Sequence, residues 1–164
     1  MITSSSLRVP KQLQEVVLHI HPEGRVVGCF FTSPQSPTCP TGETPLDILN
    51  QPIPFVVLRR EAPEELRFYN KGSIIRVEYE TEHAAEIAAL PSLRCLLHMM
   101  DGTLIRGYIR RDLHPDYARL SDYLNHCSER FAEIYADEGK LLLVNKSYVV
   151  YVTPLDEKGQ PCAS

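Results

Sequence analysis

The 164-residue sequence lacks three features that would assign it to a large class of proteins. It has no run of about 18 apolar residues, so we expect no membrane-spanning helix. Residues 1–10 have no apolar stretch after Arg8, so we expect no secretory signal peptide and favour a cytoplasmic location. Lysines and arginines occur singly or in pairs, and the formal net charge is −4. This charge pattern argues against general binding to nucleic acids or anionic membranes.

Cysteines are few, and their spacing is uninformative. There are five of them, an odd number, and no two are separated by only two residues. This spacing argues against a disulfide framework and against a zinc ribbon. We therefore expect free thiols in a reducing compartment, with no metal and no cofactor.

Motifs with a defined catalytic mechanism are also missing. The sequence contains no P-loop, G-x-G-x-x-G, G-x-S-x-G or H-E-x-x-H motif. His19, His21 and His98 raise the alternative of a metal site, but no carboxylate or cysteine accompanies them at a ligand spacing. Asp47 and Asp122 raise the alternative of a carboxylate pair, although helix capping explains each of them separately.

The sequence does contain a segment that occurs twice. Leu66–Val77 reads LRFYNKGSIIRV, and Leu141–Val152 reads LLLVNKSYVVYV. The same shift of 75 residues aligns Asp47–Asn50 with Asp122–Asn125, both of which read D-x-L-N. Further upstream, a shift of 79 residues aligns two more apolar segments and a glycine. Four matches in the same order indicate a tandem duplication.

The duplication predicts two similar units within one chain. The predicted organisation is an N-terminal extension at 1–14, repeat 1 at 15–78, a short helical linker at 79–93, repeat 2 at 94–157 and a flexible tail at 158–164. Repeat 1 has six basic and eight acidic residues and repeat 2 has eight and ten, so each carries a charge of −2. Neither half is a hidden basic domain.

Each repeat is predicted to contain five short strands and one short helix. Short apolar segments between turn residues predict the strands. The strands expected are 16–20, 26–31, 55–60, 66–69 and 74–79, then 94–99, 104–110, 131–135, 141–144 and 148–153. Each D-x-L-N segment predicts a helical turn, and in the first copy Thr44 and Asp47 have the spacing of a capping box. The expected fold class is mainly β with short helices, α+β.

Two further expectations concern turns and packing. Asn70 and Asn145 are predicted to lie in two-residue hairpin turns, with a positive φ at one of them at least, because asparagine tolerates that conformation. Leu49 and Leu124 are predicted to be buried, because each lies on the core-facing side of a short amphipathic turn.

The order of strands, glycine turn and D-x-L-N segment resembles the Sm-like fold, most closely in the second copy. Asp101–Gly107 reads DGTLIRG, Asp122–Asn125 reads DYLN, and Val144–Val152 reads VNKSYVVYV. These segments are similar to the glycine turn, the Asn signature and the last strand of that family. The resemblance implies two small five-stranded Sm-like or SH3-like barrels, or two strongly bent antiparallel sheets.

The resemblance also implies a set of binding residues, because Sm-like proteins form rings and often bind RNA. The matching positions are Asn50, Asn70, Lys71, Asn125, Asn145 and Lys146. The segments between the second and third predicted strands are longer than in that family, and the net charge is negative. For these reasons RNA binding is not carried over with the fold.

Three functions are compatible with these observations. The favoured one is a non-enzymatic protein-interaction or scaffold module that binds a protein partner. A second copy of the chain is one alternative for that partner. The second is an Sm-like RNA-binding or ring-forming protein. The third is an enzyme with a site between the two copies.

Overall fold

The computed structural model describes residues 11–34, 42–81, 89–110, 119–126, 129–137 and 139–162. Most of the predicted N-terminal extension lies outside these residues, and so does the middle of the predicted linker helix, 82–88.

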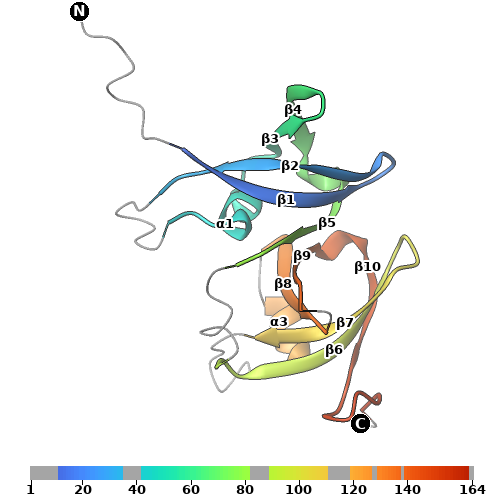
Figure 1. The fold of residues 1–164 in the computed structure, drawn as a ribbon. Coiled ribbons are helices and arrows are strands. Elements are labelled where there is room, and N and C mark those ends of the chain that lie inside the picture. Colours follow the sequence, from blue (N-terminus) through green and yellow to red (C-terminus); the bar gives the residue numbers. More distant parts are fainter. Residues whose placement is uncertain are drawn as a thin grey trace, which may run out of the picture.

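The described part of the chain forms ten strands, two α-helices and two 3-10 turns (Figure 1). The strands are β1 (Gln12–Ile20), β2 (Gly24–Thr32), β3 (Phe55–Glu61), β4 (Glu64–Asn70), β5 (Ile74–Tyr79), β6 (Ser92–Met99), β7 (Leu104–Arg110), β8 (Phe131–Ala136), β9 (Leu141–Asn145) and β10 (Val149–Pro154). The helices are α1 (Pro45–Asn50) and α3 (Leu120–His126), and the 3-10 turns are η2 (Lys71–Ser73) and η4 (Lys146–Tyr148). The prediction of a mainly β chain with short helices is confirmed, and each predicted strand is present within a few residues.

All ten strands belong to one sheet, in the order β10-β6-β7-β8-β9-β5-β1-β2-β3-β4. The first half of the chain, β1–β5, has the order β5-β1-β2-β3-β4, and the second half, β6–β10, has the order β10-β6-β7-β8-β9. β5 and β9 join the halves in the middle of the sheet, and β4 and β10 are its two edges. Figure 1 shows the first half stacked on the second, with β5 and β9 between them.

A glycine in the second strand of each half allows close contact with the third strand. A Cβ atom at Gly28 would lie 2.6 Å from the carbonyl oxygen of Arg59, and a Cβ atom at Gly107 would lie 2.5 Å from that of Tyr135. These distances are too short for any real side chain, and the obstructing atoms are backbone. Both glycines are therefore required by the approach of neighbouring strands.

The sheet encloses two apolar cores, one in each half. The first core is centred on Leu18, Phe30 and Leu58, and the second on Leu97, Ile109 and further apolar residues. Alternate residues of a strand point to opposite faces, so the central strands contribute to both cores. This explains why β9 is buried at every position from Leu141 to Asn145.

Helix α1 forms for the reason that its sequence indicates. The hydroxyl oxygen of Thr44 accepts from the backbone nitrogen of Asp47 at 3.2 Å, and the backbone nitrogen of Thr44 donates to the Asp47 carboxylate at 2.9 Å. This reciprocal pair is a capping box. Leu49 is buried as predicted, at 1% exposure, whereas Leu124 of α3 is only partly buried.

The predicted hairpin turns at Asn70 and Asn145 are wrong. Their φ angles are −67° and −72°, and no described residue other than glycine has a positive φ. Each asparagine instead caps a 3-10 turn, with its side-chain oxygen accepting from the backbone nitrogen of Gly72 at 2.8 Å or of Ser147 at 3.0 Å. The turn cannot be a hairpin, because β4 and β5 lie at opposite ends of the same five-strand group, as do β9 and β10.

Truncation of Leu49 tests the role of α1. Leu49→Ala is expected to lower the free energy of unfolding by about 2–5 kcal/mol, because it leaves a cavity in a closed core. Leu124→Ala is expected to cost less, because Leu124 is partly exposed and borders a cavity that already exists. Urea denaturation measures both values. Equal midpoints for Leu49→Ala and the wild type would show that α1 does not close the first core.

Candidate interaction surfaces at the joint and the sheet edges

The two halves are joined by antiparallel pairing of β5 with β9. The paired residues are Arg76 with Val144, Val77 with Leu143, Glu78 with Leu142 and Tyr79 with Leu141. We call this pair of strands, with the side chains that cross it, the joint. It is the part of the sheet where residues far apart in the sequence come together.

Asn145 is the central polar residue of the joint. It is fully buried, and its Nδ2 atom donates to the carbonyl oxygens of Lys71 at 3.3 Å and Ile74 at 2.9 Å. Lys71 lies in the turn η2 and Ile74 is the first residue of β5, so both carbonyls belong to the first half. The end of β9 is therefore held on the 3-10 turn of the other half.

Asn50 makes the corresponding contact from the first half. Its Nδ2 atom donates to the carbonyl oxygen of Phe131 at 3.3 Å, and its Oδ1 atom accepts from the Phe131 backbone nitrogen at 2.9 Å. The side chain of Phe131 is buried in the first core, together with that of Leu143, although both residues belong to the second half. The first core is thus completed by two side chains from the other half.

Lys71 is also buried, at 2% exposure. Its Nζ atom donates to the carbonyl oxygens of Ile48 at 2.8 Å and Gln51 at 3.0 Å, at the C-terminal end of α1. Burial lowers the pKa of this ammonium group, and the nearby charge of Arg130 lowers it further. The lysine fastens α1 to the turn and is not a surface group.

The β4 edge carries exposed apolar side chains. Phe55, Leu66 and Phe68 are all exposed, and Phe68 reaches 67%. Phe55 pairs with Asn70 across β3 and β4, as Phe131 pairs with Asn145 across β8 and β9. We call these three side chains the β4 face.

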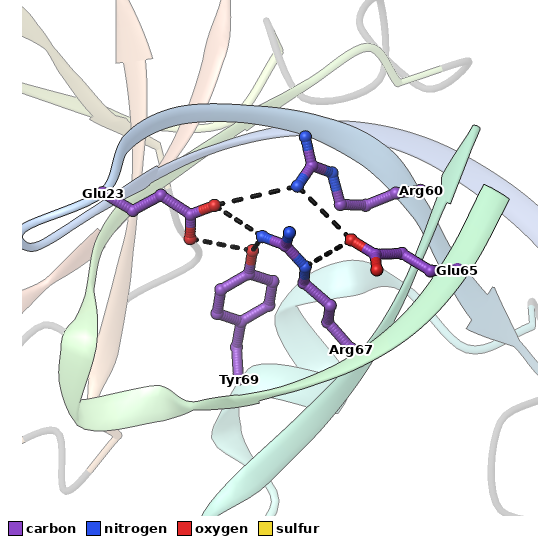
Figure 2. A network of polar contacts seen from close by, with 5 residues as sticks. All are labelled: Glu23, Arg60, Glu65, Arg67 and Tyr69. Atoms are coloured by element: carbon purple, nitrogen blue, oxygen red, sulfur yellow. Dashed lines mark hydrogen bonds and ion pairs between the residues drawn. The ribbon is translucent and has the colours of Figure 1, made fainter. Parts of the chain in front are cut away.

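A network of charged and polar groups holds β4 in place (Figure 2). Arg67 donates to Glu23 at 2.5 Å and to Glu65 at 2.7 Å, and the Tyr69 hydroxyl donates to Glu23 at 3.0 Å. Arg60 lies 3.8 Å from the same Glu23 oxygen. Partial burial opposes ionisation of Glu23, but the hydrogen bonds from Tyr69 and Arg67 hold its pKa below the ordinary value. The network ties β4, and Arg60 of β3, to Glu23 in the β1–β2 turn.

The β10 edge is the second place where apolar groups are exposed. Val150 and Tyr151 are half exposed, and a cavity of about 230 Å³ lies beside them. The cavity is lined by Leu97, Ile109, Leu124, Ala132, Ile134, Val144, Lys146, Val149, Val150, Tyr151 and Val152. All of these except Lys146 present mainly apolar surface, so the cavity suits an apolar side chain.

The end of β10 is covered by the chain that follows it. The backbone nitrogen of Leu155 donates to the carbonyl oxygen of Arg94 on β6 at 2.9 Å. The carbonyl oxygen of Pro154 instead accepts from the backbone nitrogen of Cys162 at 3.0 Å. Successive residues of a strand direct their backbone groups to opposite sides, so Pro154 faces the open side of the edge. Residues before Pro154 therefore form the open part of this edge.

The structure brings together only half of the predicted binding residues. Asn50, Lys71 and Asn145 meet at the joint. The other three lie apart: Asn70 is exposed at the end of β4, Asn125 is exposed on α3, where it donates to the carbonyl of Ser121, and Lys146 borders the cavity at 5.8 Å from the ring centre of Tyr123.

The apolar β4 face and the cavity beside β10 were not predicted from the sequence. A signal for the different settings of the two copies was nevertheless present. LLLV at 141–144 is apolar throughout, as expected of a strand covered on both faces, whereas LRFY at 66–69 is not.

A polar hollow of about 770 Å³ is lined by Tyr79, Glu80, Thr81, Arg94, Tyr108, Arg110, Tyr135, Ala136, Asp137, Gly139, Lys140 and Leu141. Within it, Arg94 pairs with Asp137 at 3.0 Å and also stacks on Tyr108. The described residues include no cluster of three histidine, cysteine or carboxylate groups suited to a metal, and His19 contacts Glu78 instead. None of the described helices has the length and apolar character needed to cross a membrane.

Comparison of the chain with protein-family models, with curated proteins and with solved structures finds no match.

Replacement of Asn145 tests the joint. Asn145→Asp keeps the oxygen that caps the 3-10 turn but removes the amide donor and places a carboxylate against two carbonyl oxygens. We expect it to lower the free energy of unfolding by about 1–3 kcal/mol or more. Asn70→Asp is the matched control, because Asn70 caps the equivalent turn but is exposed, and its cost is expected to stay below about 0.5 kcal/mol. Equal costs in urea denaturation would contradict the assignment of Asn145 to the joint.

Proposed function

We propose that the chain is a non-enzymatic protein-interaction module, built from a duplicated small β domain, that binds its partner through open sheet edges. The observation that carries this proposal is the pair of edges, β4 and β10. Each carries exposed apolar side chains and has a neighbouring strand on one side only among the described strands. Such an edge binds an additional strand readily, because backbone hydrogen bonds and apolar burial act together.

Shared local contacts support the duplication. The backbone nitrogen of Lys71 donates to Pro54, and that of Lys146 donates to Arg130 in the same setting. The same relation holds for the pairs His21 with Ser73 and Met100 with Tyr148. Together with the two asparagine caps and the two glycines, these contacts favour two copies of one folding unit. The proposal includes the form of each copy, a small Sm-like or SH3-like barrel or a strongly bent antiparallel sheet.

The burial of two residues implied by the Sm-like resemblance favours a protein partner over RNA. Lys71 and Asn145, two of the six residues implied by the Sm-like resemblance, are buried and bonded to backbone carbonyls. A lysine in that position has no access to a phosphate group. The exposed groups of the two edges are largely apolar, which suits a protein surface better than a nucleic acid backbone.

The packing between the halves and the lining of the two hollows favour an interaction module over an enzyme with a site between the copies. The space between the halves is filled by the joint, where apolar side chains such as Phe131 and Leu143 pack. In the polar hollow, Arg94 is engaged by Asp137 and by the ring of Tyr108. The cavity beside β10 is apolar and contains Lys146 as its one charged residue.

Affinity capture from the native cells tests the proposal. Immobilised wild-type protein is expected to retain a protein partner after nuclease treatment. Phe68→Glu is expected to lose that protein, because binding would bury the glutamate carboxylate without an opposite charge beside it. Leu104→Glu is the matched control, since Leu104 is 58% exposed on β7, an inner strand that pairs with β6 and β8. A partner that all three proteins retain equally, or one that nuclease removes, would contradict binding through the β4 edge.

A further inference from the structure

We propose that the partner of each edge is a second copy of this chain, so that β4 of one copy pairs with β10 of the next and repeats the joint between molecules. This inference rests on the proposed function and names its partner. It starts from a fact inside the chain: strands β5 and β9, which occupy the same places in their halves as β10 and β4, already pair with each other.

The joint supplies the register of the proposed pairing. Each residue of β10 lies 75 positions after its counterpart in β5, and each residue of β4 lies 75 positions before its counterpart in β9. Val77 pairs with Leu143 in the joint, so Val152 is expected to pair with Phe68 of the next copy. The neighbouring pairs are Tyr151 with Tyr69 and Thr153 with Arg67. The pairing stops at Pro154, which has no backbone N–H and whose carbonyl accepts from Cys162.

The cavity beside β10 is the counterpart of a space that is filled in the first half. Its lining corresponds to residues of the first core: Leu97 to Leu18, Ile109 to Phe30, Leu124 to Leu49, Ile134 to Leu58 and Val144 to Tyr69. In the first half, Phe131 and Leu143 from across the joint pack against these residues. In the second half, the corresponding space is a cavity of about 230 Å³.

The side chains that would fill the cavity are exposed at the other edge. Phe55 and Phe68 are the counterparts of Phe131 and Leu143, and both protrude from the β4 face. Inserted into the next copy, they would complete the second core as Phe131 and Leu143 complete the first. Val150 would be covered in the same step, since its counterpart in β5, Ile75, is buried.

The polar contacts of the joint also have counterparts at the edges. Asn145 donates to the carbonyls of Lys71 and Ile74, so exposed Asn70 is expected to donate to those of Lys146 and Val149 in the next copy. Asn50 makes two hydrogen bonds to the backbone of Phe131, and exposed Asn125 is expected to do the same with Phe55. These contacts give an otherwise apolar interface its specificity.

The interface would be head-to-tail, because it joins two different surfaces. A copy that pairs through its β4 edge can still pair with another copy through its β10 edge, and the reverse. Such contacts produce a ring when the rotation closes and a filament when it does not. The assembly therefore grows by addition of copies at its free edges until the rotation closes it.

Light scattering after gel filtration, at micromolar to submillimolar concentrations, tests this inference with two edge variants. Wild-type protein is expected to be larger than a dimer. Phe68→Glu, which disables the β4 edge, and Val150→Glu, which disables the β10 edge, are each expected to be monomeric, with assembly weakened by about tenfold or more. An equimolar mixture of the two variants is expected to form a dimer and nothing larger, because only one pair of intact edges remains. Leu104→Glu is expected to assemble like the wild type.

Each alternative gives a different result. Monomeric wild-type protein would overturn self-assembly. The affinity-capture experiment then decides whether the edges bind another protein. If the edge variants retain captured protein as well as the wild type does, the proposed function fails too. Oligomers retained by Val150→Glu and lost by Phe68→Glu would indicate β4–β4 pairing and overturn the head-to-tail interface. Failure of the mixture to dimerise also overturns it. Leu66→Glu and Tyr151→Glu are second variants for the two edges, and circular dichroism confirms that every protein compared is folded.

Discussion

The antiparallel pair of β5 and β9 is the interaction on which the rest of the structure depends. It makes one sheet of two five-strand groups, and it places side chains of the second half in the core of the first. Each core contains side chains from the other half, because Phe131 and Leu143 of the second half lie in the first core and Ile75 of the first half lies in the second. Buried Asn145 fixes the register, since its amide donors would be left unpaired by a shift of one residue.

The same constraint explains the differences between the copies. β9 is always covered on both faces and is therefore apolar from Leu141 to Val144. β4 is covered on one face only, and its polar residues Glu65 and Arg67 form the network that joins it to the β1–β2 turn. At the other edge, Pro154 and the chain after it shorten the open part of β10. Both edges are thus restricted to a short, defined segment, which limits unspecific strand pairing.

Much of the local structure could be predicted from the sequence, because it depends on short-range patterns. The strands follow apolar periodicity, and α1 follows from the capping box at Thr44 and Asp47. The joint could not be predicted in this way, since no local pattern indicates that β5 pairs with a strand whose paired residues lie 62 (Tyr79 to Leu141) to 68 (Arg76 to Val144) positions later. The Asn-Lys turns were misjudged because asparagine suits a hairpin and a 3-10 cap equally well, and only the strand order separates the two. The burial of Lys71 could not be predicted either, because the carbonyl oxygens that accept from its Nζ atom belong to the end of α1, in another part of the chain.

Hydrogen exchange measured by mass spectrometry at several protein concentrations tests the central claim most directly, because it reports on all four strands in one experiment. If the joint is repeated between copies, the amides of β5 and β9 are protected at every concentration, while those of β4 at 66–70 and of β10 at 150–153 become protected as concentration rises. Protection of β4 and β10 that does not change with concentration, in wild-type protein that remains monomeric, would contradict the account.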